Sequence, residues 1–199
     1  IVDYPGEWLL DLPMLAQDYL SWSRQMTGLL QGQRAAWSTK WRALCEGLDP
    51  LAPADENRLA AIAEAWTDYL HQCKQEGLHF IQPGRFVLPG DLAGAPALQF
   101  FPWPDVDGAG ESKLAQAGKH TTAGMLRERY NYYCEKVVKG FYKNHFLRFD
   151  RQIVLVDCLQ PLNSGPQAFN DMRLALTQLM QSFHYGQRTL FRRLFSPVI

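Results

Sequence analysis

The chain has 199 residues, of which 47% are hydrophobic, and this composition is typical of a globular protein with one large core or two small ones. Twenty basic residues balance twenty acidic ones, so the formal net charge is zero. A balanced charge argues against broad electrostatic capture of nucleic acid. Because the sequence has no apolar run of about eighteen residues and no signal-peptide pattern, we expect neither a transmembrane segment nor export.

The first residues place an acid and a glycine at one sharp corner. Ile1 and Val2 favour a strand, Pro5 and Gly6 favour a turn, and an apolar helix start follows. In nucleotide-hydrolysing P-loop proteins, an aspartate placed like Asp3 holds Mg²⁺, usually through water. A glycine three residues later lets a backbone N–H approach the terminal phosphate. An ordinary strand-to-helix turn is the alternative interpretation.

Helices are predicted along most of the chain after this corner. Asp11 can cap a first helix that has Pro13 in its first turn and continues to residue 30. Apolar residues recur at helical spacing over residues 37–48, and again over residues 55–77, where Asp at the start and Gly at the end mark the limits.

Residues 77–110 are rich in proline, glycine and aromatic residues. This composition favours short strands and fixed turns in an ordered loop region. Phe100, Phe101 and Trp103 either pin the loop to its own core or form a docking surface, and pinning is the favoured interpretation.

The later part of the chain predicts a helix, a strand and another helix. Residues 122–142 have a helical apolar face, and residues 151–157 form a continuous apolar run that is typical of a buried strand in a parallel sheet. This strand is expected beside residues 1–2. Asp157 either adds to a ligand site or caps the next turn, and the cap is the favoured interpretation. A further helix is predicted over residues 168–184.

The chain has four cysteines, which are Cys45, Cys73, Cys134 and Cys158. They are well separated and form no Cys-x-x-Cys pair. This usage is typical of reduced residues and predicts a cytoplasmic protein.

The run VDYPGEWLLDLP, residues 2–13, resembles the signature of the YcjX-like family of bacterial stress proteins, which are predicted P-loop NTPases. The run RFDRQIVLVDCLQPLNSGPQAF, residues 148–169, is similar to the same family. The resemblance implies an α/β P-loop NTPase core with a partial parallel sheet and a large, mainly helical insertion. It places the strand end and Asp-x-x-Gly corner in residues 1–11, the insertion in 12–150, and a core strand with its following helix in 151–199.

The same resemblance implies the nucleotide contacts. Asp3 would hold Mg²⁺ through water, and the Gly6 amide would sense the terminal phosphate. Tyr4 and Pro5 complete the implied nucleotide-binding corner.

Three further residues are candidates for catalysis. Glu7 stands where Ras-like GTPases often keep a water-orienting glutamine, although an acid here also favours the start of a helix. Arg148 and Arg151 are candidates for stabilising transition-state charge, and the alternative is that they solvate the entry of the strand.

Two motifs that a complete P-loop GTPase needs are missing from the sequence. The chain contains no Gly-x-x-x-x-Gly-Lys-Ser/Thr loop and no base-recognition motif. In the nearest imitation, residues 118–121, Lys113 occupies the first glycine position and His120 interrupts the Lys-Thr pair. We therefore expect a middle segment of a longer protein that is inactive by itself.

The function implied for the intact protein is Mg²⁺-dependent hydrolysis of a nucleoside triphosphate, with GTP preferred over ATP, as a stress-response switch. The alternative is a helical protein-interaction module in which GTP or GDP is only regulatory. Its partner would belong to a membrane-associated stress response and would bring the protein to the periphery of the inner membrane.

Overall fold

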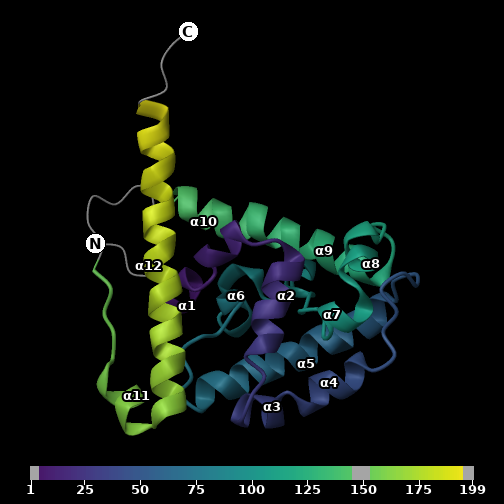
Figure 1. The fold of residues 1–199 in the computed structure, drawn as a ribbon, viewed down its shortest axis with the longest axis horizontal. Helices are drawn as coiled ribbons and strands as arrows, with labels where there is room; N and C mark the ends of the chain where they lie inside the picture. The colour runs from purple at the N-terminus through teal and green to yellow at the C-terminus, as the bar shows by residue number, and fades with distance from the viewer. Residues whose placement is uncertain (1–4, 145–152, 195–199) are drawn as a thin grey trace.

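The computed structural model is a body of helices with one long helix, α12, standing across one end (Figure 1). The structure describes residues 5–144 and 153–194. The elements in chain order are α1 (Gly6–Leu9), the 3-10 turn η1 (Leu12–Ala16), α2 (Tyr19–Gly28), α3 (Gln33–Trp37), α4 (Thr39–Cys45), α5 (Glu56–Gln75), α6 (Gly84–Val87), η2 (Gly90–Leu92), η3 (Pro96–Leu98), α7 (Val106–Ala109), α8 (Glu111–Gln116), α9 (Thr122–Tyr132), the π-helical segment η4 (Tyr133–Val138), α10 (Lys139–Asn144), α11 (Leu159–Asn163) and α12 (Pro166–Leu194). Among the described residues, no helix combines the length and apolar character needed to cross a bilayer.

The predicted α/β core with a partial parallel sheet is wrong for the part of the chain that the structure describes. Those residues contain no β-strand. From residue 153 on, the predicted strand over 151–157 is an irregular segment in which Ile153 and Leu155 are 87% and 91% exposed. A continuous apolar run indicates burial, but a buried strand needs paired neighbours, and none lies beside this segment in the described ranges. Residues 1–2, its predicted neighbours, lie outside those ranges.

Helix α5 confirms the predicted helix over residues 55–77. Asp55 caps its N-terminus by accepting hydrogen bonds from the amides of Asn57 at 3.0 Å and Arg58 at 3.2 Å. Gly77 follows its C-terminus with a φ of +80°, a conformation that glycine adopts without strain. Its apolar face is buried and includes Leu59, Ile62, Ala63, Trp66, Tyr69, Leu70 and Cys73.

The first predicted helix is divided, and the second is shorter than predicted. Asp11 makes no capping hydrogen bond, and the chain forms η1 before an extended Gln17 and a new start at α2. There Asp18 is the cap, because its side chain accepts from the amide of Ser21 at 2.7 Å. The helix predicted over residues 37–48 is seen as the shorter α4, and α3, which was not predicted, ends at Trp37 just before it. Periodicity indicated which side of these helices is buried, although Leu15 and Leu44 are each 39% exposed, and it did not mark the observed helix ends.

The region over residues 77–110 forms short helical turns, so the predicted short strands are wrong. The aromatic residues behave as the favoured interpretation predicted. Phe100 and Phe101 are 0% exposed and Trp103 is 2% exposed, which confirms that they pin the region to the core. Phe100 packs against Tyr130 with ring centroids 5.9 Å apart.

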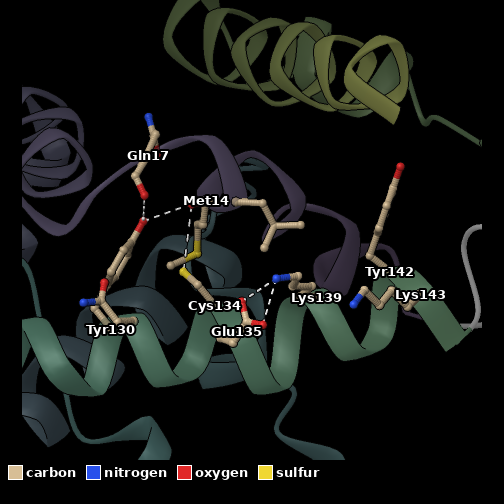
Figure 2. Close-up of a pocket in the computed structure, with 10 residues that line it drawn as sticks. Met14, Gln17, Tyr130, Cys134, Glu135, Lys139, Tyr142 and Lys143 are labelled. Atoms are coloured by element: carbon tan, nitrogen blue, oxygen red, sulfur yellow. Dashed lines mark hydrogen bonds and ion pairs between the residues drawn. The ribbon is translucent and has the colours of Figure 1, made fainter. Parts of the chain in front are cut away.

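The predicted helix over residues 122–142 is seen as α9, the π-helical segment η4 and α10 in continuous succession. The Tyr130 hydroxyl reaches the carbonyl oxygens of Met14 at 3.2 Å and Gln17 at 3.1 Å, and so joins α9 to η1 (Figure 2). A cavity of about 510 Å³ lies along this junction, and Glu135 and Lys139 form an ion pair at its edge (Figure 2).

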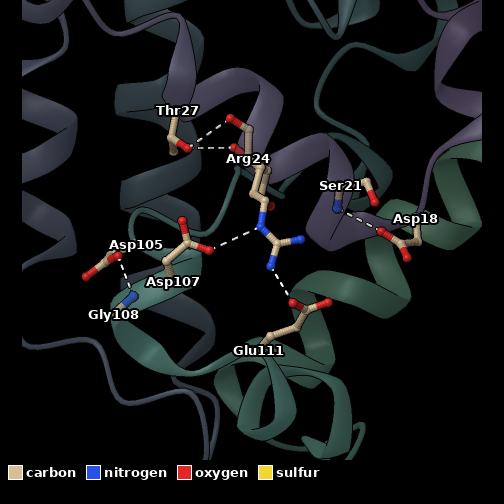
Figure 3. A network of polar contacts seen from close by, with 9 residues as sticks. Asp18, Ser21, Arg24, Thr27, Asp105, Asp107, Gly108 and Glu111 are labelled. Carbon is tan, nitrogen blue, oxygen red and sulfur yellow. Dashed lines mark hydrogen bonds and ion pairs between the residues drawn. The ribbon is translucent and has the colours of Figure 1, made fainter.

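One arginine on the body's surface joins α2 to two later helices. Arg24 contacts Asp107 of α7 through Nε at 3.2 Å and Glu111 of α8 through Nη2 at 2.6 Å (Figure 3). The carboxylates are exposed, so these ion pairs are expected to add little to stability.

A buried ion pair holds α12 on the body. Arg34 Nη2 of α3 lies 2.6 Å from Asp171 Oδ1 of α12, and their side chains are 5% and 7% exposed. Asp171 Oδ2 accepts hydrogen bonds from the amides of His79 at 2.7 Å and Phe80 at 2.6 Å. Arg34 also donates to the Tyr69 hydroxyl at 3.0 Å. Four separate segments therefore meet at one carboxylate–guanidinium pair.

We predict that Asp171→Asn lowers the free energy of unfolding by about 3 kcal/mol or more, because it leaves the buried Arg34 cation without its counter-charge. Urea unfolding followed by circular dichroism measures the change. The matched control is Asp68→Asn, which breaks an exposed ion pair with Lys40 and should cost less than about 1 kcal/mol. Equal, small effects of both substitutions would show that the buried pair does not hold α12.

Candidate functional site at the Gly6 corner

The corner that the sequence singled out begins helix α1. Pro5 precedes the helix, Gly6 is its first residue, and Glu7 lies in its first turn. The other predicted nucleotide-binding residues, Asp3 and Tyr4, lie outside the described residues. The predicted catalytic candidates Arg148 and Arg151 also lie outside them.

The side chain of Glu7 is held by the helical body. Lys74 Nζ, near the C-terminus of α5, lies 2.7 Å from Glu7 Oε1, and the two side chains are 39% and 24% exposed. Burial raises the pKa of Glu7, but the hydrogen bond and charge of Lys74, with the Glu7 backbone amide, outweigh it and leave the pKa below its usual value. Glu7 is therefore an ionised, paired carboxylate at neutral pH.

The backbone of Glu7 is also closely packed. A Cβ built on Gly84 would lie 1.9 Å from the Glu7 carbonyl oxygen, so only glycine permits the observed approach of α6 to α1. The first turn after the corner is thus fixed to α6 by its main chain and to α5 by its side chain.

Trp8 adds a second attachment to the same region. Its indole Nε1 donates to the carbonyl oxygen of Leu88 at 2.9 Å. The guanidinium carbon of Arg85 lies 3.3 Å from the ring centroid, which is a close cation–π contact. The ring of Phe141 from α10 meets Trp8 edge-on at 5.9 Å.

Asp11 completes the attachment from a fully buried position. Its Oδ1 accepts from the amide of Gly84 at 2.7 Å, and its Oδ2 accepts from the Tyr133 hydroxyl at 2.5 Å and the Arg85 amide at 3.4 Å. Burial raises the pKa of Asp11 to about 7, although the three donors and the Arg85 charge oppose the rise. The sequence suggested only a helix cap here.

A cavity of about 370 Å³ opens between α1, the end of α5, residues 154–157 and α12. Gly6 and Glu7 line it together with Asp157, so the structure brings one predicted corner and one later predicted position to the same cavity. Asp157 Oδ1 accepts from the amides of Leu159 at 3.0 Å and Gln160 at 3.1 Å, which confirms its favoured role as a cap.

The cavity wall is largely apolar, and His79 is one of the residues that line it. The Nε2 atom of His79 is buried and has no hydrogen-bond partner among the described residues. Lys74, His79 and Asp11 were all missed as site residues from the sequence. Each lies in or beside an apolar segment. Lys74 and His79 are far from the Gly6 corner in sequence, and Asp11, five residues from Gly6, matched the pattern of a helix cap.

The nearest sequence imitation of a phosphate loop is an ordinary turn. Gly118, Lys119 and His120 are exposed and precede α9. Thr121 caps that helix by accepting from the amide of Gly124 at 3.3 Å. The element before this turn is α8.

Comparison with known proteins defines the class to which this chain belongs. The model of the YcjX-like family, DUF463, matches residues 1–199, and the chain therefore belongs to that family. The predicted resemblance is confirmed.

Two curated relatives carry a more specific name. The chain is 91% identical over 199 residues to a protein of Escherichia coli (strain K12) named "Ras-like GTPase YcjX". It is 47% identical over 205 residues to a protein of the same name from Shewanella oneidensis. The matches cover 100% of this chain but 43% and 41% of the relatives, so the chain spans less than half their length.

We predict that Asp11 makes the protein less stable as pH rises from about 4 to about 7. The folded-state pKa of about 7 lies above the unfolded value of about 3.9, so the folded state binds more protons in this window. The stabilising contribution of Asp11 is complete below about pH 4, declines as the pH rises, and is lost once the pH has passed about 7. The free energy of unfolding falls by at most about 1.4 kcal/mol per pH unit in this window.

Urea unfolding at several pH values, compared between wild type and Asp11→Asn, tests this contribution. The difference in unfolding free energy between the two proteins should change across the window, because the asparagine does not titrate. A constant difference from pH 4 to 7 would contradict the raised pKa.

Proposed function

We propose that this chain is part of a GTPase whose corner, Asp3 to Gly6, binds Mg²⁺-nucleotide and senses the terminal phosphate. The observation that carries the proposal is the identity, along the whole chain, to two proteins named Ras-like GTPases. GTP is preferred to ATP because of that Ras-like name. The chemistry of hydrolysis requires mainly positioning and charge stabilisation, and the corner would supply one part of that positioning.

The metal part of the proposal depends on Asp3. Within residues 5–144 and 153–194, the structure contains no cluster of three histidine, cysteine or acidic side chains that could hold a metal ion. Glu7, the acid next to Gly6, is already paired with Lys74. A Mg²⁺ ion would therefore need Asp3, the nucleotide's own phosphates and further ligands from outside the described residues.

A switch follows from the way the corner is attached. Contacts that hold the first turns after Gly6 run to α5 through Lys74, to α6 through Gly84, and to η4 through Asp11 and Tyr133. Loss of the terminal phosphate would move the corner, and these contacts would pass the movement to the helical body. In the proposed protein, residues 12–150 form the responding part and residues 1–11 and 151–199 belong with the nucleotide site.

A second candidate function is a protein-interaction module that nucleotide only regulates, with a partner in a membrane-associated stress response. One observation favours it. Apolar side chains are exposed in succession after residue 152, and they are Ile153, Leu155, Leu159 and Leu162, with exposures of 87%, 91%, 72% and 58%. A surface of this kind is typical of an interface.

The first test is a titration with fluorescent GTP and ATP in the presence of Mg²⁺. We expect no measurable binding to this chain alone and tight binding to a protein of the relatives' full length, with GTP favoured. Tight binding by the chain alone would contradict the assignment of the corner as half of a site.

The two candidate functions separate on substitution at the corner of the full-length protein. Gly6 lies in open space, since a Cβ there meets no described atom within 4 Å, so Gly6→Ala should fold normally. We predict that Asp3→Ala and Gly6→Ala each lower GTP turnover about 100-fold, the order expected for loss of one transition-state contact. Unchanged turnover with altered partner binding would favour the interaction module instead.

A further inference from the structure

We propose that Lys74 of α5 is a positioning residue for Glu7, so that the helical body supplies part of the hydrolytic site. This inference rests on the proposed function. It begins from one contact, the 2.7 Å ion pair between Lys74 Nζ and Glu7 Oε1, one residue beyond Gly6. The two partners come from distant parts of the sequence and from different parts of the fold.

The contact differs from an ordinary surface ion pair. The Lys40–Asp68 pair has a similar length, 2.8 Å, but its side chains are 68% and 56% exposed, against 39% and 24% for Lys74 and Glu7. The main chain of Glu7 is fixed by Gly84, and Trp8 is fixed by Arg85 and Leu88. The carboxylate of Glu7 is therefore held by Lys74, and its backbone is held by the packing against Gly84. An exposed ion pair alone does not fix a side chain in this way.

The pairing resolves a conflict in the chemistry of Glu7. A lone carboxylate beside the terminal phosphate would repel it, because like charges a few ångströms apart interact strongly outside bulk water. Lys74 compensates that charge through Oε1 and lowers the pKa of Glu7, so the group stays ionised. The ion-pair distance is to Oε1. In the proposed arrangement the second oxygen, Oε2, accepts a hydrogen bond from the attacking water.

The balance of the reaction leaves both residues unchanged. The water oxygen forms a bond to the terminal phosphorus of GTP, and the bond from that phosphorus to the bridging oxygen breaks. GDP and inorganic phosphate are the products, and the proton lost by the water ends on phosphate or solvent. Glu7 orients the water, and Lys74 acts only through Glu7.

The test uses full-length protein and four substitutions: Lys74→Met, Lys74→Arg, Glu7→Ala and, as the control, Lys40→Met. Steady-state GTP hydrolysis is measured from pH 3.5 to 8.5, which includes the acid limb expected for Glu7, together with GTP affinity and thermal unfolding. We expect Lys74→Met to lower kcat about tenfold or more with less than about a threefold change in KM. Lys74→Arg should restore most of kcat, and Lys40→Met should match wild type.

The pH profile separates positioning from mere support of the fold. Without Lys74, burial dominates and the pKa of Glu7 rises, so the acid limb of kcat should move to higher pH in Lys74→Met. Glu7→Ala, which removes the oxygen that accepts from the water, should lower kcat and remove that limb. A protein that is less stable but otherwise intact would keep the wild-type profile.

Two results would overturn the proposal. If Lys74→Met keeps the wild-type kcat and pH profile and loses only thermal stability, the ion pair is structural. If Glu7→Ala hydrolyses GTP as well as wild type, there is no role for Lys74 to support. Wild-type turnover no higher than that of Asp3→Ala would instead overturn the proposed function, and this inference with it.

Discussion

The Asp171 carboxylate is the interaction on which the arrangement of the described chain depends. It accepts from Arg34 and from the amides of His79 and Phe80, so α3, the turn after α5, and α12 meet at one buried group. A buried charge is costly unless its partners are complete, and here the two carboxylate oxygens are engaged from three directions. Because α12 also forms one wall of the cavity at the Gly6 corner, the same pair fixes the shape of the candidate site.

The Gly6 corner is held by several separate contacts rather than by one buried ion pair. Glu7, Trp8 and Asp11 follow Gly6 within five residues, and each contacts a separate part of the body. Main-chain packing at Gly84 removes the remaining freedom. The residues after Gly6 are therefore continuous in structure with the helical body, and a site at this corner would share its surroundings with α5 and α6.

Sequence patterns predicted the elements that are specified locally. Asp55 and Gly77 bound α5 as expected, and Phe100 and Trp103 are buried as expected. Asp11 was misinterpreted because its partners, Gly84 and Tyr133, are distant in sequence, and a capping pattern before Pro13 looks the same whether or not the side chain turns inward. The apolar run over residues 151–157 was wrongly predicted to be a buried strand for a related reason. Hydrophobic residues indicate that a segment can be buried, but a strand also needs a second segment with which to form hydrogen bonds. Residue types at the start of the chain predicted the corner, and the contact between Lys74 and Glu7 could be found only in the structure.

The stacking of Trp8 on Arg85 has an optical consequence. An indole emits at a wavelength that depends on nearby charge and solvent, and here a guanidinium lies 3.3 Å from its ring centroid. Trp8 is two residues from Gly6, whereas Trp22, Trp41, Trp66 and Trp103 are enclosed in the core. The protein thus carries a natural fluorophore beside its candidate site, in surroundings chemically unlike those of its core tryptophans.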